Sequence, residues 1–445
     1  MRNLNLVLCM TLLTLGLISG RFAFAIDTPD PCTVIAEEII PLRLPNFDQA
    51  ALWKKTSGVK GSERPRALLP VVDGGQIMIG SSTPYDEKTG LSTPRIQIVR
   101  TDKVGKVIVE KWPEVKNLKT VADAVLLKDR VVALTQIGAE NEETIGLVFL
   151  NGVGEIRSTA IISDPKLRLV PKSMMVVPGG AQMIIAAEAI SREDSKDSYS
   201  VLIWTDQDGA KQTQKEYLPG VKNKPEYVGR LANGEIVMTG RSTTEDGRDA
   251  GWVLRLSAKG EILYQRPYAR GGDSVIRRAV SLGDGTMVVV GDALPLIEGD
   301  KAAWVMRLDK DGTPIWQKYV TGKYSYSGVD VIALNDGRLN VLISGKPTSA
   351  GGRQYARVLT LSAAGVIIGD ESFIEGANAI PVRLIHQGTA NRVLLGLAET
   401  GFSKEGLPDD LKYIAYDSWL LGLAPLPDYH NSCAGGPART LDDLP

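Results

Sequence analysis

The sequence repeats itself with a period of about 52 residues, and this constrains the fold more than any other feature. Residues 249–264 (DAGWVLRLSAKGEILY) align closely with residues 301–316 (KAAWVMRLDKDGTPIW). A unit of this size cannot bury a core by itself, so the periodicity indicates an array of similar units packed against one another. The glycine of a turn in this segment recurs at Gly105, Gly154, Gly209, Gly260, Gly312 and Gly365.

A second turn precedes each of these and is followed by a short run rich in β-branched residues. Its copies lie at residues 73–74, 128–129, 178–179, 233–234, 284–285, 336–337 and 387–388. Tight turns beside such runs are typical of hairpins. Each unit then has strands A to D, with tight A–B and C–D turns and a longer B–C loop. Seven copies predict an all-β, seven-bladed β-propeller. The alternative, two stacked β-sandwiches, does not predict so steady a period.

The predicted blades lie near residues 65–113, 119–163, 168–218, 225–268, 273–321, 326–375 and 378–424. The last unit reaches strand C but lacks strand D. The segment 33–40 (TVIAEEII) is similar to the D strand that begins at Gly365. We therefore expect an N-terminal strand at 33–42 to complete the last blade, which would remove an open sheet edge. Residues 26–433 would form this single domain, and residues 434–445 a flexible tail.

The first 25 residues have the pattern of a secretory signal peptide. Arg2 precedes an apolar run at residues 4–18, and Ala23-Phe24-Ala25 forms a cleavage site. The run is short for a membrane span, which needs about 20 residues. We expect cleavage after Ala25, a periplasmic or secreted mature protein and no transmembrane segment in it.

The cysteines fit export. Cys9 would leave with the signal peptide, and Cys32 and Cys433 would remain near the two ends of the chain. A strand at 33–42 in the last blade would bring them together, so we predict a Cys32–Cys433 disulfide that closes the ring. The alternative is two unpaired thiols.

Composition excludes several kinds of function. The formal net charge is −1, which removes the usual argument for nucleic-acid binding. Two histidines leave little room for a histidine-rich metal site. The Asp-x-Asp-Gly elements at 206–209 and 309–312 fall in C–D turns, where aspartate and glycine serve turn geometry better than calcium binding. We expect no metal and no cofactor.

Candidate ligand-binding residues lie where the strands nearest the axis begin. These entrances are mainly basic, whereas the B–C loops are acidic, so a small anionic ligand could bind at the axis. The alternative is that these side chains pair across neighbouring A strands and fill the channel. The candidates are Arg66, Lys172, Arg277, Arg278, Arg383, Asp123 and Asp330. The acidic loop residues include Glu142, Glu193, Asp194, Glu245, Asp246, Asp249 and Asp292.

The pattern at 303–316 (AWVMRLDKDGTPIW) resembles bacterial propeller repeats of quinoprotein-like and related extracytoplasmic proteins. The resemblance covers most of residues 65–424 as a style of repeat, and it implies the fold but no activity. Quinoprotein dehydrogenases typically carry two adjacent cysteines, which this chain lacks. The Gly-His and Trp-Asp dipeptides of WD40 repeats and the Asp boxes of sialidases are also missing.

Two functions remain open. The absence of a catalytic constellation favours a non-catalytic, exported propeller that acts as a protein-binding or scaffold module, with its partner on the face of the long loops. The alternative is an enzyme or binding protein for a saccharide or small anionic ligand in the axial pocket. A carboxylate-only catalytic site cannot be located from sequence, so enzymatic activity stays open.

Overall fold

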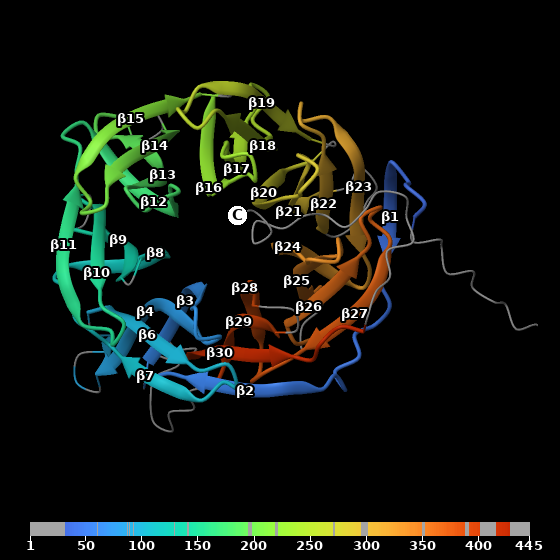
Figure 1. The fold of residues 1–445 in the computed structure, drawn as a ribbon, viewed down its shortest axis with the longest axis horizontal. Coiled ribbons are helices and arrows are strands. Elements are labelled where there is room, and N and C mark those ends of the chain that lie inside the picture. Colours follow the sequence, from blue (N-terminus) through green and yellow to red (C-terminus); the bar gives the residue numbers. More distant parts are fainter. Residues whose placement is uncertain are drawn as a thin grey trace, which may run out of the picture.

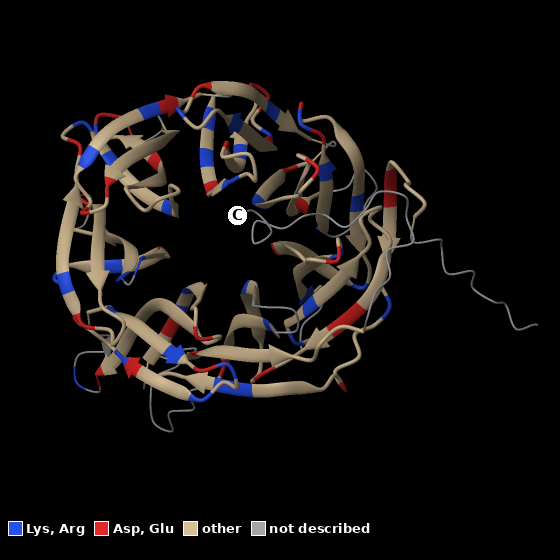
Figure 2. Ribbon diagram, viewed as in Figure 1, with Lys and Arg blue, Asp and Glu red and all other residues tan. Residues whose placement is uncertain are grey.

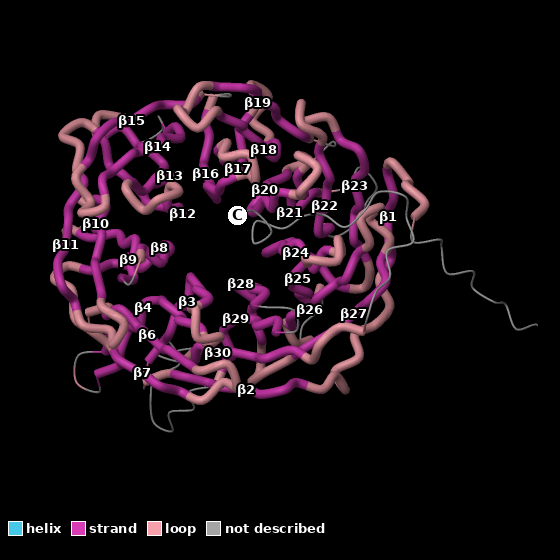
Figure 3. The backbone as a smooth tube through the Cα atoms, in the orientation of Figure 1, coloured by secondary structure: helices cyan, strands magenta, loops and turns pink. Residues whose placement is uncertain are grey.

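The computed structural model is a closed ring of β-sheets around an axis (Figure 1). It describes residues 32–427 except 60, 87, 89, 92, 129, 140–141, 195–197, 219–220, 270–271, 295–300, 349–351, 388–390 and 401–414. Within these residues the regular structure is all strand, as Figure 3 shows. The predicted all-β, seven-bladed propeller is therefore confirmed. No helix in the described ranges is long and apolar enough to cross a membrane.

Each blade is an antiparallel sheet whose first strand lies nearest the axis. Blade 1 comprises β3 (Gly61–Pro70), β4 (Gln76–Asp86), β6 (Arg95–Thr101) and β7 (Val107–Lys111), with β5 (Gly90–Leu91) paired to β4. Blade 2 comprises β8 (Leu118–Leu127), β9 (Arg130–Ile137), β10 (Thr144–Leu150) and β11 (Ile156–Ile162). Blade 3 comprises β12 (Leu167–Val176), β13 (Gln182–Ser191), β14 (Ser198–Asp206) and β15 (Lys211–Tyr217).

The remaining blades follow the same order. Blade 4 comprises β16 (Lys222–Arg230), β17 (Ile236–Thr243), β18 (Asp249–Leu256) and β19 (Ile262–Tyr268). Blade 5 comprises β20 (Ser274–Ser281), β21 (Met287–Ala293), β22 (Ala302–Leu308) and β23 (Pro314–Thr321). Blade 6 comprises β24 (Tyr324–Ala333), β25 (Leu339–Pro347), β26 (Tyr355–Leu361) and β27 (Ile367–Phe373). Blade 7 comprises β28 (Ala379–Gln387), β29 (Asn391–Glu399) and β30 (Tyr416–Leu423).

An N-terminal strand does close blade 7, but it is not the predicted segment 33–42. The closing strand is β2 (Ala51–Ser57), which pairs antiparallel with β30. The ring of Trp53 anchors it, because a β-carbon on either Gly105 or Gly422 would lie 2.3 Å from that ring. A residue with a side chain at either glycine would displace Trp53.

The segment predicted to close the ring instead forms β1 (Glu37–Pro41), a fifth strand on the outside of blade 5. It runs parallel to β23. The buried Lys318 explains the attachment, since its Nζ donates to Glu38 Oε2 at 2.7 Å and to the Ile35 carbonyl at 3.2 Å. After β1 the chain runs along blade 6, where the Phe47 ring packs edge-to-face against the Tyr355 ring, and then reaches blade 7.

The repeated arginine of strand C connects neighbouring blades. Arg255 Nη1 donates to the Lys310 carbonyl at 2.7 Å, and Arg307 Nη1 donates to the Ala363 carbonyl at 2.8 Å. Both acceptors lie in the C–D turn of the next blade. The sequence motif that defines the repeat is thus explained by contacts between blades, and apolar side chains fill the rest of each interface.

The two Asp-x-Asp-Gly elements are turns, as predicted. Asp206 Oδ1 accepts from the amides of Asp208 and Ala210, and Asp309 Oδ1 accepts in the same way from Asp311 and Thr313.

The predicted signal peptide, Cys433 and the predicted tail lie outside the described residues.

Candidate functional site: a cationic axial cavity

Every inner strand carries a β-bulge at the same place in the repeat. A bulge inserts one unpaired residue and re-aims its side chain. The seven inserted residues line one cavity on the axis, so each blade contributes one of them. They are Arg66, Ala122, Lys172, Glu226, Arg277, Val329 and Val382. We call this set the bulge ring.

Proline and glycine produce the bulge locally. A proline precedes the inserted residue in four blades, and it cannot donate a ladder hydrogen bond. In three of these a glycine lies opposite on the second strand, and a β-carbon there would meet the inner-strand backbone at 2.1 to 2.8 Å. The inner and second strands can therefore lie this close together only because the residue opposite the proline is a glycine, which has no side chain. The pairs are Pro65 with Gly80, Pro225 with Gly240 and Pro381 with Gly396.

The cavity has a volume of about 890 Å³, which suits a small-molecule ligand. Gln136, Leu397 and Tyr416 also line it. These lie where strands B end and strands C begin, so the cavity is on the face from which the long loops leave. Figure 2 shows Lys and Arg at the inner ends of several strands around the axis. All five predicted basic residues line the cavity: Arg66, Lys172, Arg277, Arg278 and Arg383.

Two cations of the bulge ring are held by buried acids on the second strand of their own blade. Lys172 Nζ lies 3.4 Å from Glu188 Oε2, and Lys224 of the next blade lies 3.3 Å from Oε1 of the same side chain. In blade 5, Arg277 Nη1 lies 2.6 Å from Asp292 Oδ1, and Lys301 Nζ lies 3.0 Å from Oδ2. Asp292 is therefore a buried partner of Arg277 on β21 and not one of the exposed acids of the B–C loops, where the sequence had suggested it.

Arg66 has no such partner. In blade 1 the position equivalent to Glu188 and Asp292 is taken by Ser81, which has no charge. Ser81 lies opposite Arg64 in the strand pairing. The side chains of Arg64 and Arg66 are exposed within the cavity. No hydrogen bond or ion pair holds either guanidinium among the described residues. Desolvation by the cavity walls, together with the charge of Arg64, lowers the pKa of Arg66. An anion between them would relieve this repulsion.

Asp123 and Asp330 do not line the cavity. Each directly follows the inserted residue and is buried. Asp123 Oδ2 accepts from the Met174 amide at 3.1 Å, and Asp330 Oδ2 accepts from the Leu384 amide at 2.9 Å. These amides occupy equivalent positions in the next blade, so both carboxylates connect neighbouring inner strands.

The two aspartates also pair with the remaining predicted arginines. Arg278 Nε lies 3.9 Å from Asp330 Oδ1, and its guanidinium stacks on the Tyr227 ring at 4.6 Å. Arg383 Nη2 lies 3.8 Å from Asp123 Oδ1. Burial raises the pKa of both aspartates, and the charge of Arg278 opposes that rise. The alternative that charged side chains pair with one another thus holds for Arg278 and Arg383. Arg66 has no such pair among the described residues, and anion binding at the axis stays a prediction.

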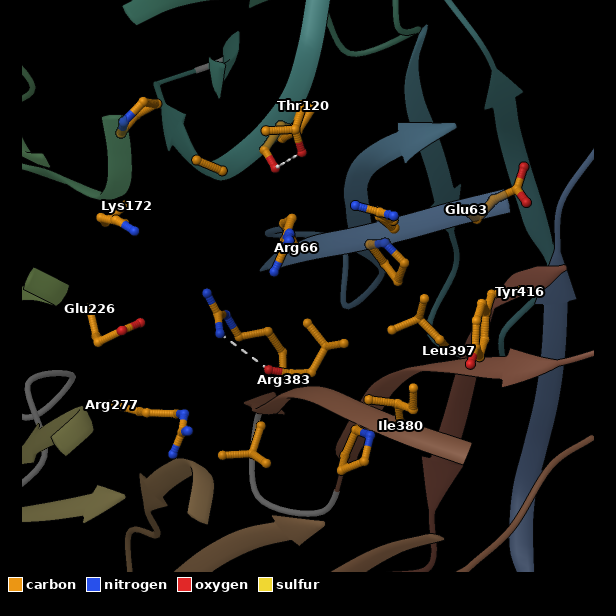
Figure 4. Close-up of a pocket in the computed structure, with 18 of the residues that line it drawn as sticks. Glu63, Arg66, Thr120, Lys172, Glu226, Arg277, Ile380, Arg383, Leu397 and Tyr416 are labelled. Atoms are coloured by element: carbon orange, nitrogen blue, oxygen red, sulfur yellow. Dashed lines mark hydrogen bonds between the residues drawn. The ribbon is translucent and has the colours of Figure 1, made fainter. Parts of the chain in front are cut away.

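Sequence reasoning missed Arg64, Glu188 and Glu226. Glu226 lies between Lys172 and Arg277 on one side of the cavity, facing Arg66 and Arg383 (Figure 4). The sequence did contain a feature that could have identified Glu226. Prolines recur in step with the repeat, at Pro65, Pro171, Pro225 and Pro381. The residue after each proline is a bulge-ring residue.

Comparisons with known proteins bear on the fold of this chain and assign no function to it. No protein-family model and no curated protein matches the chain. Among solved structures, puromycin hydrolase is 16% identical with a TM-score of 0.49; the match covers 77% of this chain and 51% of that one, so this chain spans about half its length. A PL25 ulvan lyase bound to -[GlcA(1-4)Rha3S]- is 10% identical with a TM-score of 0.50, over 77% of this chain and 93% of that one.

A third match is the β-propeller domain of the Trilobed protease from Pyrococcus furiosus. It is 12% identical with a TM-score of 0.39, over 64% of this chain and 78% of that one. At 10% identity the likeness to the ulvan lyase shows the fold alone.

Proposed function

We propose that this protein binds a small anionic ligand in its axial cavity. The observation that carries the proposal is the pair Arg64 and Arg66, which lie in the cavity with no carboxylate paired to them among the described residues. Lys172, Arg277, Arg278 and Arg383 add to the positive field around them. Enclosed clefts lined by one sign of charge concentrate ligands of the opposite sign.

The proposal is tested by titrating the protein with carboxylate, sulfate and phosphate compounds by calorimetry. We expect saturable binding that weakens as ionic strength rises. Replacing Arg64 and Arg66 by Gln should reduce the affinity at least tenfold, since each charge-assisted hydrogen bond contributes about 1.5–3 kcal/mol. The matched control is Arg157→Gln, an exposed arginine on β11. Equal affinity in all three proteins would refute the proposal.

Catalysis at this site stays open, and hydrolases and lyases are among the proteins that share the fold. The protein-binding or scaffold role on the long-loop face also remains a prediction.

We further propose export, with cleavage after Ala25 and a periplasmic or secreted destination. N-terminal sequencing of the protein from fractionated cells of its source tests this, and an intact Met1 on soluble cytoplasmic protein would refute it.

A further inference from the structure

Glu226 is the one acid of the bulge ring, and it is not neutralised by its neighbours. It is half-buried in the cavity wall, and within the described part of the chain no hydrogen bond or ion pair engages its carboxylate. The cations on either side are already held elsewhere, Lys172 by Glu188 and Arg277 by Asp292. The cavity therefore offers a free hydrogen-bond acceptor as well as free guanidinium groups.

The two kinds of free group lie on opposite sides of the cavity. Arg64 and Arg66 come from blade 1, and Glu226 comes from blade 4. Their charges still interact, because Glu226 acts to raise the pKa of Arg66 against the effects of burial and Arg64. Between them, on the side of blades 6 and 7, four apolar side chains line the wall beside Arg383: Val329, Ile380, Val382 and Leu397.

From this arrangement we infer that the ligand is a hydroxylated carboxylate, such as a sugar acid. The inference rests on the proposed function and adds Glu226 as a specificity-determining residue. The acid group binds Arg64 and Arg66, a ring hydroxyl donates to Glu226, and C–H groups of the ring contact the apolar wall. An ammonium group at Glu226 is disfavoured, because Lys172 and Arg277 flank that position (Figure 4) and each shares its acid with a further lysine, which leaves a net positive charge on both sides. A hydroxyl avoids this repulsion, since it can also accept hydrogen bonds from those cations.

Four probes of similar size separate these features: glucuronate, cyclohexanecarboxylate, trans-4-aminocyclohexanecarboxylate and glucose. We expect the wild-type protein to bind glucuronate about tenfold more tightly than cyclohexanecarboxylate, and glucose and the amino acid more weakly than either. These comparisons need no variant. Equal affinity for the two carboxylates, or preference for the amino acid, would overturn the inference while leaving anion binding intact. Failure of every anion to bind would instead overturn the proposed function.

Two variants then test the residues. Glu226→Gln should weaken glucuronate about tenfold while leaving cyclohexanecarboxylate unchanged or bound more tightly, because a negative charge has left the cavity. Arg66→Gln should weaken both carboxylates together. Arg157→Gln should change neither. A Glu226→Gln protein with an unchanged ratio of the two affinities would overturn the role of Glu226.

Discussion

Arg383 of blade 7 pairs with Asp123 of blade 2 at 3.8 Å, although blade 1 separates the two. The equivalent position in blade 1 is Ala67, the residue that follows its inserted Arg66. Ala67 has no polar group at this position, so Arg383 pairs with the acid of the blade beyond it. Arg66 thus lines the cavity with no ion-pair partner among the described residues, whereas Arg383 also helps to hold the ring together.

Removing the Asp123 carboxylate should destabilise the fold strongly. Asp123→Ala leaves the Met174 amide and the Ser173 hydroxyl without their acceptor and leaves Arg383 unpaired. Loss of one partner of a buried charged network costs about 3–5 kcal/mol. Urea unfolding should show this loss, and Asp330→Ala at the equivalent position should behave alike. Asp208→Ala, an exposed site, should change the free energy of unfolding by less than about 0.5 kcal/mol. A similar small effect for Asp123→Ala would contradict the structural role.

Glu63 should make the protein less stable as pH rises. Burial raises its pKa from 4.5 to about 7, with the charge of Asp417 adding to the effect. The folded state then holds a proton that the unfolded state has lost, so the free energy of unfolding falls between pH 4.5 and 7. The total is about 3 kcal/mol. Glu63→Gln should lack this slope and be the more stable protein at pH 8. Its amide also retains an oxygen for the Ser82 hydroxyl, which now donates to Glu63 at 2.9 Å.

The control for this titration is Glu245→Gln, a change of the same kind in an exposed loop. It should keep the wild-type slope in chemical unfolding measured at pH 5, 6, 7 and 8. If Glu63→Gln also kept that slope, the titration would belong to another group.

The sequence predicted the ring and its basic axis because both depend on features that recur with the repeat. Turn glycines and β-branched runs mark each blade, and Arg66, Lys172 and Arg277 occupy one position of the unit. The bulge that aims them inward was not predicted, since it depends on contacts such as Pro65 against Gly80. Nor could single positions show that Glu188 holds Lys172 while Ser81 leaves Arg66 unpaired.

The closing strand was assigned wrongly for a related reason. Outer strands of a propeller are largely exposed, so they carry little alternation of apolar and polar residues. β2 shows this, with mainly exposed or half-exposed residues along its length. Local similarity to another D strand therefore favoured residues 33–42. The pairing of β1 with β23 depends on Lys318, which lies 280 residues away from its partner Glu38 in the sequence.

Truncation distinguishes the two N-terminal strands. A chain that starts at residue 45 lacks β1 but keeps β2, so it should fold cooperatively with a modest loss of stability. A chain that starts at residue 59 lacks β2, which leaves Trp419 and Leu421 under an open sheet edge, and it should not fold cooperatively. Circular dichroism and urea unfolding in reductant provide the measurement. A chain starting at residue 33 controls for the loss of Cys32. Failure of the chain starting at 45 would show that β1 is needed for closure.

The Cys32–Cys433 disulfide stays a prediction, although the reasoning behind it changes. Cys32 lies just before β1, which is attached to blade 5 rather than blade 7. Arg338 Nη1 of blade 6 donates to the Pro427 carbonyl at 2.9 Å, so the chain leaving β30 runs toward that side of the ring. Six further residues reach Cys433 and can span about 20 Å. We therefore still expect the Cys32–Cys433 bond.

Peptide mapping of the oxidised protein without reductant should recover one cross-linked peptide that contains both cysteines. Reduction should lower the free energy of unfolding by up to about 5 kcal/mol, because the bond closes a loop of some 400 residues in the unfolded chain. Cys433→Ser should reproduce that loss and make reductant ineffective. Two thiols that both react with iodoacetamide in the native, oxidised protein would refute the bond.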